Sequence, residues 1–250
     1  MPAPQATMMS QLARTKFTTF GLKVPSNWRD PQGEDAKQYN DAFADNEKSA
    51  APGSPPLFLP ATMNKYHVDS QKMHIAKIGK YIDDVTKAIC GAWGQWQNAA
   101  TMSLVLINGP VASGGKLIGP PIGPMILAQG PVSTPSEAKY TKVIADVLGT
   151  AWQTFTASVT IAALPWYPPY AAVPVNPAPP IANVPTPFAS LVQVPLSIMA
   201  TTTKPQMIAQ LGDPQAPFHK ELFESVADAF EKTYTAWKVS TMVTNVMPTL

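Results

Sequence analysis

The stretch from Val147 to Thr203 constrains the fold most, because its 57 consecutive residues include no Lys, Arg, Asp or Glu. About a quarter of the residues in an average sequence are charged, against 14% in this chain. Ten of the 31 residues from Pro165 to Pro195 are proline, which suits neither a helix interior nor a central strand. Such a neutral, apolar segment is expected to be buried, and burial against other chains is the simplest prediction.

Charged residues concentrate in the two outer parts of the chain. Residues 1–87 hold 11 basic and 9 acidic residues, and residues 204–250 hold four and five. Nowhere do Lys and Arg gather as a nucleic-acid footprint requires. The first residues lack the basic-then-apolar order of a secretory signal, and no segment offers the roughly 20 predominantly apolar residues of a membrane span. We therefore expect an origin in the cytoplasm, with no nucleic acid and no stable membrane span among its partners.

Apolar residues recur at three- and four-residue steps in three segments, the pattern of amphipathic helices. The first is predicted from Asp69 or Ser70 to about residue 102. The second begins near Pro135, where Thr134 and Glu137 have the spacing of a capping box, and ends before residue 165. The third runs from about residue 213 or 217 to the region before residue 248.

Each predicted helix carries an Ala-Trp pair late in its run: Ala92-Trp93, Ala151-Trp152 and Ala236-Trp237. An old duplication would explain this repetition. A bundle core that needs small residues beside Trp would explain it equally well, because helical spacing alone generates such matches.

The predicted fold is mainly α, with three long amphipathic helices, extended Pro/Gly-rich loops and a short β-hairpin near Leu104–Leu127. Leu104–Ile107 reads as a strand closed by the turn at Asn108-Gly109-Pro110. Lys116–Met125 is predicted to be a turn-rich loop. Residues 1–62 are predicted to form an extended Pro-rich arm. Residues 63–250 are predicted to form a helical domain with Pro/Gly-rich excursions over 103–135 and 165–212.

Candidate catalytic residues are sparse. His67 and His74 lack the further ligands that a metal site needs, and the neighbouring Asp83 and Asp84 point in different directions on a helix, as on a solvated face. The single cysteine, Cys90, excludes an intrachain disulfide and reads as a small core residue. The sequence predicts no catalytic residue, no metal site and no cofactor, and so a protein that is not an enzyme.

Seven apolar side chains set among prolines and outside the predicted helices are the candidates for contacts with other subunits. They are Ile118, Ile122, Met125, Trp166, Tyr167, Tyr170 and Phe188. The aromatic members would also suit a platform for a sugar or a peptide. Packing is favoured, because aromatic residues give large contact areas and no flanking polar cluster marks a ligand cleft.

Four phrases of the sequence carry a resemblance to a known class of protein: Ala92–Trp96, Ile107–Gly115, Leu164–Ala171 and Asn183–Pro187. Across about residues 80–187 the chain resembles small structural proteins of contractile-tailed phages and related contractile injection particles. The resemblance implies a non-enzymatic structural subunit of the baseplate, tail or neck, present in several copies. It also implies a virion or phage-like particle assembled in the host cytoplasm, other particle subunits as partners, a homo-oligomer, and no small-molecule substrate.

Two other functions are carried as alternatives. In the first, the chain is a membrane-active or secreted helical effector or binding module, whose Val147–Leu164 segment inserts into lipid. Six Thr, Ser or Gln residues in that segment argue against insertion. In the second, the chain is an enzyme whose site is completed between subunits, although no residue pattern motivates a substrate.

Overall fold

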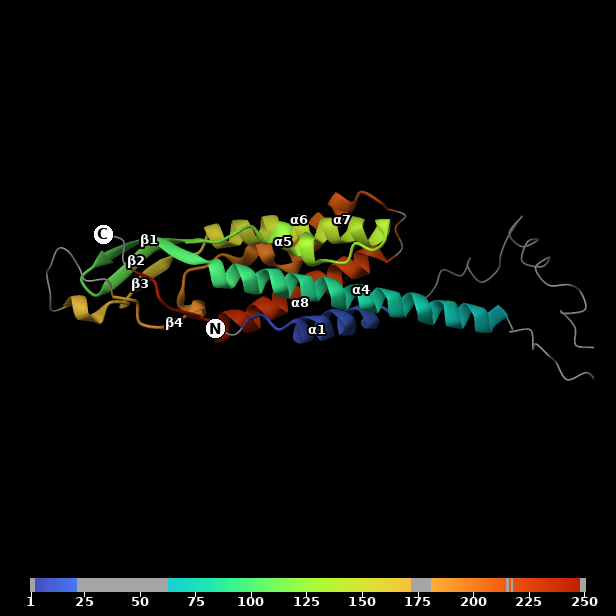
Figure 1. Cartoon of the computed structure of the whole chain (residues 1–250), viewed down its shortest axis with the longest axis horizontal. Helices are drawn as coiled ribbons and strands as arrows, with labels where there is room; N and C mark the ends of the chain where they lie inside the picture. The colour runs from blue at the N-terminus through green and yellow to red at the C-terminus, as the bar shows by residue number, and fades with distance from the viewer. Residues whose placement is uncertain (1–2, 22–62, 172–180, 215, 217, 248–250) are drawn as a thin grey trace, which may run out of the picture. The chain divides into compact units, whose positions relative to one another are not determined.

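A computed structural model describes residues 3–21, 63–171, 181–214, 216 and 218–247 (Figure 1). The chain divides into two compact units. The larger unit comprises Met1–Phe20 and Tyr81–Leu250, and the smaller one comprises Gly21–Lys80. The larger unit contains the helical core, the sheet and every contact described below.

The described residues are mainly helical, as predicted, but hold more helices than the three long ones expected. The three predicted helices correspond to α4 (Met63–Ala99), α6 (Pro135–Ala157) and α8 (His219–Ser240). Three further helices were not predicted: α1 (Ala6–Thr19), α5 (Ile122–Gln129) and α7 (Ala200–Leu211). The short 3₁₀ turns are η2 (Pro168–Ala171), η3 (Phe188–Ser190) and η4 (Pro195–Ile198).

The predicted hairpin is present as β1 (Thr101–Asn108) and β2 (Val111–Ile118), which pair antiparallel around the turn at residues 109–110. A third strand, β3 (Ile161–Leu164), adds to β2 and completes a sheet of order β1-β2-β3. Two short strands, β4 (Thr186–Pro187) and β5 (Met242–Val243), pair separately. Figure 1 shows the three-stranded sheet beside the ends of the core helices.

The turn-rich loop predicted over Lys116–Met125 is wrong at both of its ends. Its first residues complete the central strand β2, and its last residues belong to α5. Proline did not prevent this helix because Pro121 immediately precedes it and Pro124 lies in its first turn. The N–H that proline lacks would have no intrahelical partner at those positions.

Three tryptophans, one from each predicted helix, meet in the core. The ring centroids of Trp93 and Trp152 are 4.8 Å apart, and those of Trp93 and Trp237 are 5.1 Å apart. Phe230 packs against the first two rings, and Ala92 and Ala151 are buried beside them. Core packing therefore accounts for the small residue in two of the three Ala-Trp pairs, whereas Ala236 is exposed. The capping box of Thr134 and Glu137 is also confirmed, with both reciprocal hydrogen bonds at 3.1 Å.

The first part of the chain corrects the prediction of an extended arm. Residues 6–19 form α1, which packs on α8. Met9, Ala13 and Phe17 are buried, and their four-residue spacing is the sequence signal that identifies this helix face. Cys90 is buried against Met9, with its thiol 3.6 Å from the Met9 sulfur, so its predicted core role is confirmed. Residues 22–62, the rest of the predicted arm, lie outside the described residues.

The excursion predicted over 165–212 is also corrected at its end, where α7 packs between α6 and α8. Pro205 lies inside this helix, and no charged residue occupies its first turn. The backbone N–H of Ala200 donates to the carboxylate of Glu231, on α8, at 2.8 Å. A side chain from another helix thus satisfies an N-terminal amide that no local residue caps.

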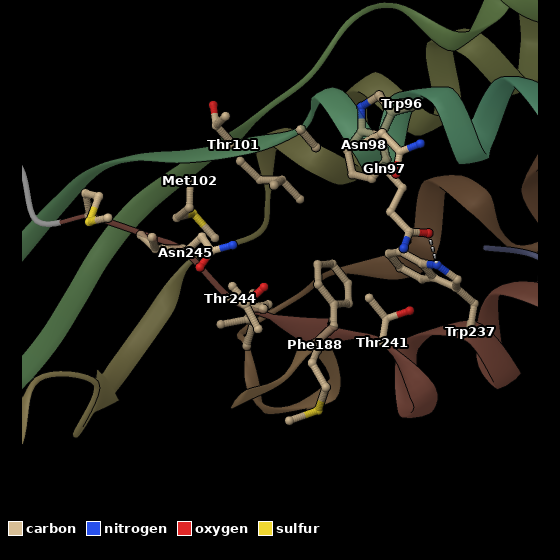
Figure 2. Close-up of a pocket in the computed structure, with 17 residues that line it drawn as sticks. Trp96, Gln97, Asn98, Thr101, Met102, Phe188, Trp237, Thr241, Thr244 and Asn245 are labelled. Carbon is tan, nitrogen blue, oxygen red and sulfur yellow. Dashed lines mark hydrogen bonds between the residues drawn. The ribbon is translucent and has the colours of Figure 1, made fainter. Parts of the chain in front are cut away.

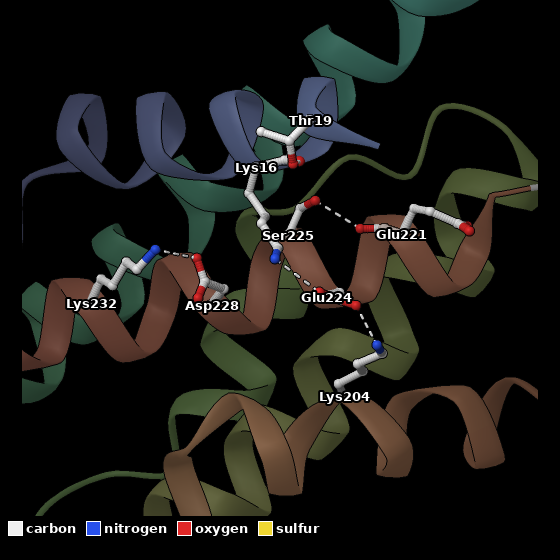
Figure 3. A network of polar contacts seen from close by, with 8 residues as sticks. All are labelled: Lys16, Thr19, Lys204, Glu221, Glu224, Ser225, Asp228 and Lys232. Atoms are coloured by element: carbon white, nitrogen blue, oxygen red, sulfur yellow. Dashed lines mark hydrogen bonds and ion pairs between the residues drawn. The ribbon is translucent and has the colours of Figure 1, made fainter. Parts of the chain in front are cut away.

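One carboxylate links three helices (Figure 3). Glu224 on α8 pairs with Lys16 on α1, at 3.0 Å, and with Lys204 on α7. The hydrogen bonds from Lys204 and Lys16 lower the pKa of the Glu224 carboxyl from its ordinary value of 4.5. Because the folded protein favours the ionised form, this carboxylate stabilises the fold at neutral pH.

We expect the stabilisation from Glu224 to be lost in acid. A carboxyl with a lowered folded-state pKa contributes fully above its ordinary pKa of 4.5, and the contribution fades as the pH falls through the folded-state value. Urea unfolding of Glu224→Gln should therefore give a lower midpoint than wild type at pH 7, with the difference shrinking below pH of about 4. Glu221→Gln, one turn earlier on α8, is the control. A constant difference down to pH of about 3 would contradict the ionic role.

Candidate functional site

Five of the seven predicted contact residues are buried within the chain itself. They are Ile122, Trp166, Tyr167, Tyr170 and Phe188. A side chain covered by its own fold has no surface left for another subunit, so these five are corrected from contact residues to core residues. Ile118 is 47% exposed and Met125 is half-buried. Their role in subunit contacts stays a prediction.

Backbone hydrogen bonds explain why the Trp166–Tyr167 segment turns inward. The N–H of Tyr167 donates to the carbonyl of Pro110 at 3.0 Å, and the N–H of Val184 donates to the carbonyl of Trp166 at 2.8 Å. The Tyr167 hydroxyl donates to the Val246 carbonyl at 3.1 Å. These bonds join the hairpin turn, the segment after β3 and Val246, so the described residues around Trp166 and Tyr167 are covered by this chain's own elements.

The part of the larger unit around the strands is nearly free of charge. We call it the sheet end and define it as residues 101–118, 161–171, 181–191 and 241–247. Lys116 is its one charged residue. In the described residues, by contrast, every ion pair joins side chains on helices or immediately after one. The sheet end therefore presents a neutral surface, while the helical end carries the charged groups that favour hydration.

Large apolar side chains are exposed on this neutral surface. Leu104 and Leu106 on β1 are 67% and 68% exposed. Ile118, Val184 and Met247 are exposed as well. Scattered exposed apolar residues are normal, but a group of them on an uncharged surface is typical of a contact region.

Backbone strain also gathers at the sheet end. Of the described non-glycine residues with positive φ, Leu104 (57°), Ala163 (46°) and Asn245 (59°) lie there. The pairing of β1 with β2 is interrupted at Leu104 without a change of register, because Ser103 pairs with Lys116 and Val105 with Gly114. Leu104 is exposed there, whereas Val105 is buried. A bulky residue in the left-handed region costs energy, and such strain is often retained at functional sites.

A cavity of about 520 Å³ lies where the sheet end meets the ends of α4 and α8 (Figure 2). Its lining comes from the end of α4, the start of β1, η3, the end of α8 and residues 241–247. Trp96, Phe188 and Trp237 contribute buried rings, and the Trp237 indole N–H donates to Gln97 at 2.8 Å. Polar side chains stand near the rings, and none of the lining residues is charged. The composition suits a neutral group with both apolar and hydrogen-bonding parts.

Several titratable side chains on α4 and α8 serve structural roles. Burial raises the pKa of the Cys90 thiol to about 12 and raises the pKa of the Tyr81 and Tyr234 hydroxyls, so none is activated at neutral pH. The burial of Asp83 raises its pKa, but hydrogen bonds from Arg14 and Ser10 outweigh this and lower it overall. Asp83, predicted to lie on a solvated face, therefore anchors α1 to α4.

The described residues contain no group of three or more His, Cys, Asp or Glu side chains placed to hold a metal ion. His67 and His74 lie on the first turns of α4, where only the backbone is described. No helix within the described ranges combines the length and the apolar character needed to cross a bilayer.

No family model, curated protein or solved structure matches this chain.

Proposed function

We propose that this chain is a non-enzymatic structural subunit of a multi-protein particle, and that its sheet end makes the contacts with neighbouring subunits. The resemblance of residues 80–187 to contractile-tailed phage proteins leads us to propose a virion or phage-tail-like particle. Other copies of the chain and other particle subunits are the proposed partners. No cofactor or substrate enters this role.

The observation that carries the proposal is the neutral sheet end with its exposed leucines. Surface charge normally keeps a protein monomeric and soluble. Here one end of the larger unit has a single charged residue, Lys116, while Leu104 and Leu106 project from an edge strand. Exposed apolar side chains on a strand at the edge of a sheet favour pairing with another chain. A subunit that is buried in a particle would keep this end away from water.

The alternatives receive less support from the described residues. A lipid-inserting Val147–Leu164 segment would have to leave α6 and β3, where Leu148, Trp152 and Phe155 are fully or almost fully buried in the core. For an enzyme, the described residues offer no group of three or more His, Cys, Asp or Glu side chains placed to hold a metal ion. Both ideas remain distinguishable from the proposal by liposome flotation and by turnover assays of the purified chain.

The proposal predicts that the purified chain forms a defined oligomer and that Leu104→Gly/Leu106→Thr abolishes it. Glycine removes the exposed leucine and relieves the positive φ of 57° at position 104. Threonine at position 106 removes the second leucine, and its own high propensity for β-strands preserves the strand. The variant should therefore stay folded, with an unchanged far-ultraviolet circular dichroism spectrum, and elute as a monomer. Light scattering coupled to size-exclusion chromatography measures the mass.

Val132→Thr provides the matched control. Val132 is 53% exposed and lies between α5 and α6, outside the sheet end, so its replacement should leave the oligomer intact. A wild-type chain that stays a stable monomer at micromolar concentration would overturn the assembly proposal. Loss of the oligomer in Val132→Thr as well would show that the contact is not confined to the sheet end.

A further inference from the structure

The cavity at the sheet end combines an aromatic floor with a neutral polar mouth. Trp96, Phe188 and Trp237 are each less than 5% exposed and, from opposite sides of the cavity, form the buried aromatic lining that we call the floor (Figure 2). At the mouth, Asn98 and Asn245 are exposed and Thr244 is half-buried. Within the described residues these three side chains make no hydrogen bond, so their amide and hydroxyl groups are available to a ligand.

Two backbone segments line this cavity. One is the start of β1, at Thr101 and Met102, and the other runs from Met242 to Met247. Figure 2 shows Trp96 and Thr101 on one side of the cavity and Phe188 and Thr241 on the other. Strand β1 pairs with β2, and β5 pairs with β4, so the two segments belong to different sheets with the cavity between them.

We propose that the cavity receives an uncharged, extended peptide segment of a neighbouring subunit, with one apolar side chain on the aromatic floor and its peptide groups at the amide mouth. The choice of this peptide as the ligand rests on the proposed function, because a neighbouring subunit of a particle would supply such a segment. The chemistry of the cavity selects it in two ways. A charged side chain would lose its hydration with no opposite charge in the lining to compensate, whereas amide side chains match the donors and acceptors of a peptide bond.

Both the volume and the setting of the cavity favour a peptide. About 520 Å³ is in the range of small-ligand sites, enough for one large side chain with its flanking backbone. Recognition of an extended segment commonly combines main-chain hydrogen bonds with a pocket for a side chain. The exposed leucines of β1 lie on the same neutral end of the unit, so a neighbour held there could deliver a segment to the cavity.

Methionine methyl NMR on the full chain tests the site directly. Met102, Met242 and Met247 line the cavity. Met9 on α1 and Met207 on α7 are fully buried, do not line the cavity, and serve as internal references. The capped tripeptide acetyl-Ala-Leu-Ala-amide should shift the three cavity methyls and leave the two references unchanged. The matched peptide with Asp in place of Leu should give no shift at the same concentration.

A variant at the mouth tests the role of the amides. Asn245 has a φ of 59°, so Asn245→Gly removes the amide while suiting the backbone. Loss of a hydrogen bond to the peptide should weaken binding roughly three- to tenfold. Gln153→Ala removes an exposed amide on α6 that does not line the cavity, and should leave binding unchanged.

Each other outcome overturns the inference without deciding the proposed function. If neither peptide shifts the cavity methyl signals, or if both peptides shift them equally, the cavity is not a site for a neutral peptide. Binding of acetyl-leucinamide as tight as that of the tripeptide would replace the peptide by a small neutral molecule. If Asn245→Gly binds the tripeptide with the same affinity as the wild-type chain, the Asn245 amide plays no part in binding the peptide. The experiment on the Leu104 and Leu106 variant measures a different quantity, the mass of the oligomer. The two proposals can therefore fail separately.

Discussion

Trp93→Ala should cost about 3–5 kcal/mol of unfolding free energy, the range for truncating a large buried aromatic residue. The Trp93 side chain is fully buried. Its ring contacts those of Trp152, Phe230, Tyr234 and Trp237, with centroid distances from 4.8 to 6.5 Å. These partners come from α6 and α8, so one truncation opens a cavity where all three long helices meet. A domain typically has only about 5–15 kcal/mol of stability to lose.

Urea unfolding followed by circular dichroism measures this loss, and a second variant keeps the prediction testable if the alanine variant does not fold. The Trp93 indole N–H has no hydrogen-bond partner in the described residues, so Trp93→Phe loses packing volume alone and should cost less than the alanine variant. Val239→Ala, at a 63% exposed position late in α8, should change stability by less than about 0.5 kcal/mol. A cost below about 1 kcal/mol for Trp93→Ala would contradict the central place of this ring.

Gly149→Ala is the second large expected effect, because it forces two backbones apart. A β-carbon at position 149 would lie 2.8 Å from the Cα of Gly123 and 3.0 Å from its nitrogen. Gly149 belongs to α6 and Gly123 to α5, so the two helices cross at paired glycines. Overpacking against a backbone costs about 1–3 kcal/mol. We expect a net loss of stability of this order, measured as a lower urea midpoint.

Gly91→Ala is the matched control, and the opposite sign is expected. A β-carbon there would lie 2.4 Å from the side-chain oxygen of Gln129, but that side chain is exposed and can rotate away. Alanine is favoured over glycine inside a helix by up to about 1 kcal/mol, so the variant should be neutral or slightly more stable. Equal losses at the two positions would show that helix crossing is not the cause.

Much of the helical framework could be predicted from the sequence, because it depends on local spacing. The three- and four-residue steps that bring Trp93, Trp152 and Trp237 onto helix faces are visible without a fold. The capping box of Thr134 and Glu137 is equally local, since its partners are three residues apart. The hairpin followed from its turn residues. Helix α1 was missed although Met9, Ala13 and Phe17 carried the same kind of signal over a shorter length.

The candidate site depended on contacts between distant parts of the chain, and the sequence could not provide it. Trp166 and Tyr167 read as outward contact residues because they lie among prolines. Only their bonds to Val184 and Pro110 turned them inward. The cavity likewise forms from segments that are neighbours in space alone, such as Thr101 and Asn245.

By itself the sequence determined a mainly helical chain with a neutral middle, because helix periodicity and charge content are properties of neighbouring residues. Tertiary structure alone decided where the neutral region is covered and where it is exposed. It also decided that α7 forms despite Pro205, with Glu231 of α8 accepting the hydrogen bond from Ala200 at 2.8 Å. Burial and capping of this kind depend on groups that meet only after the helices have packed, so no local pattern records them.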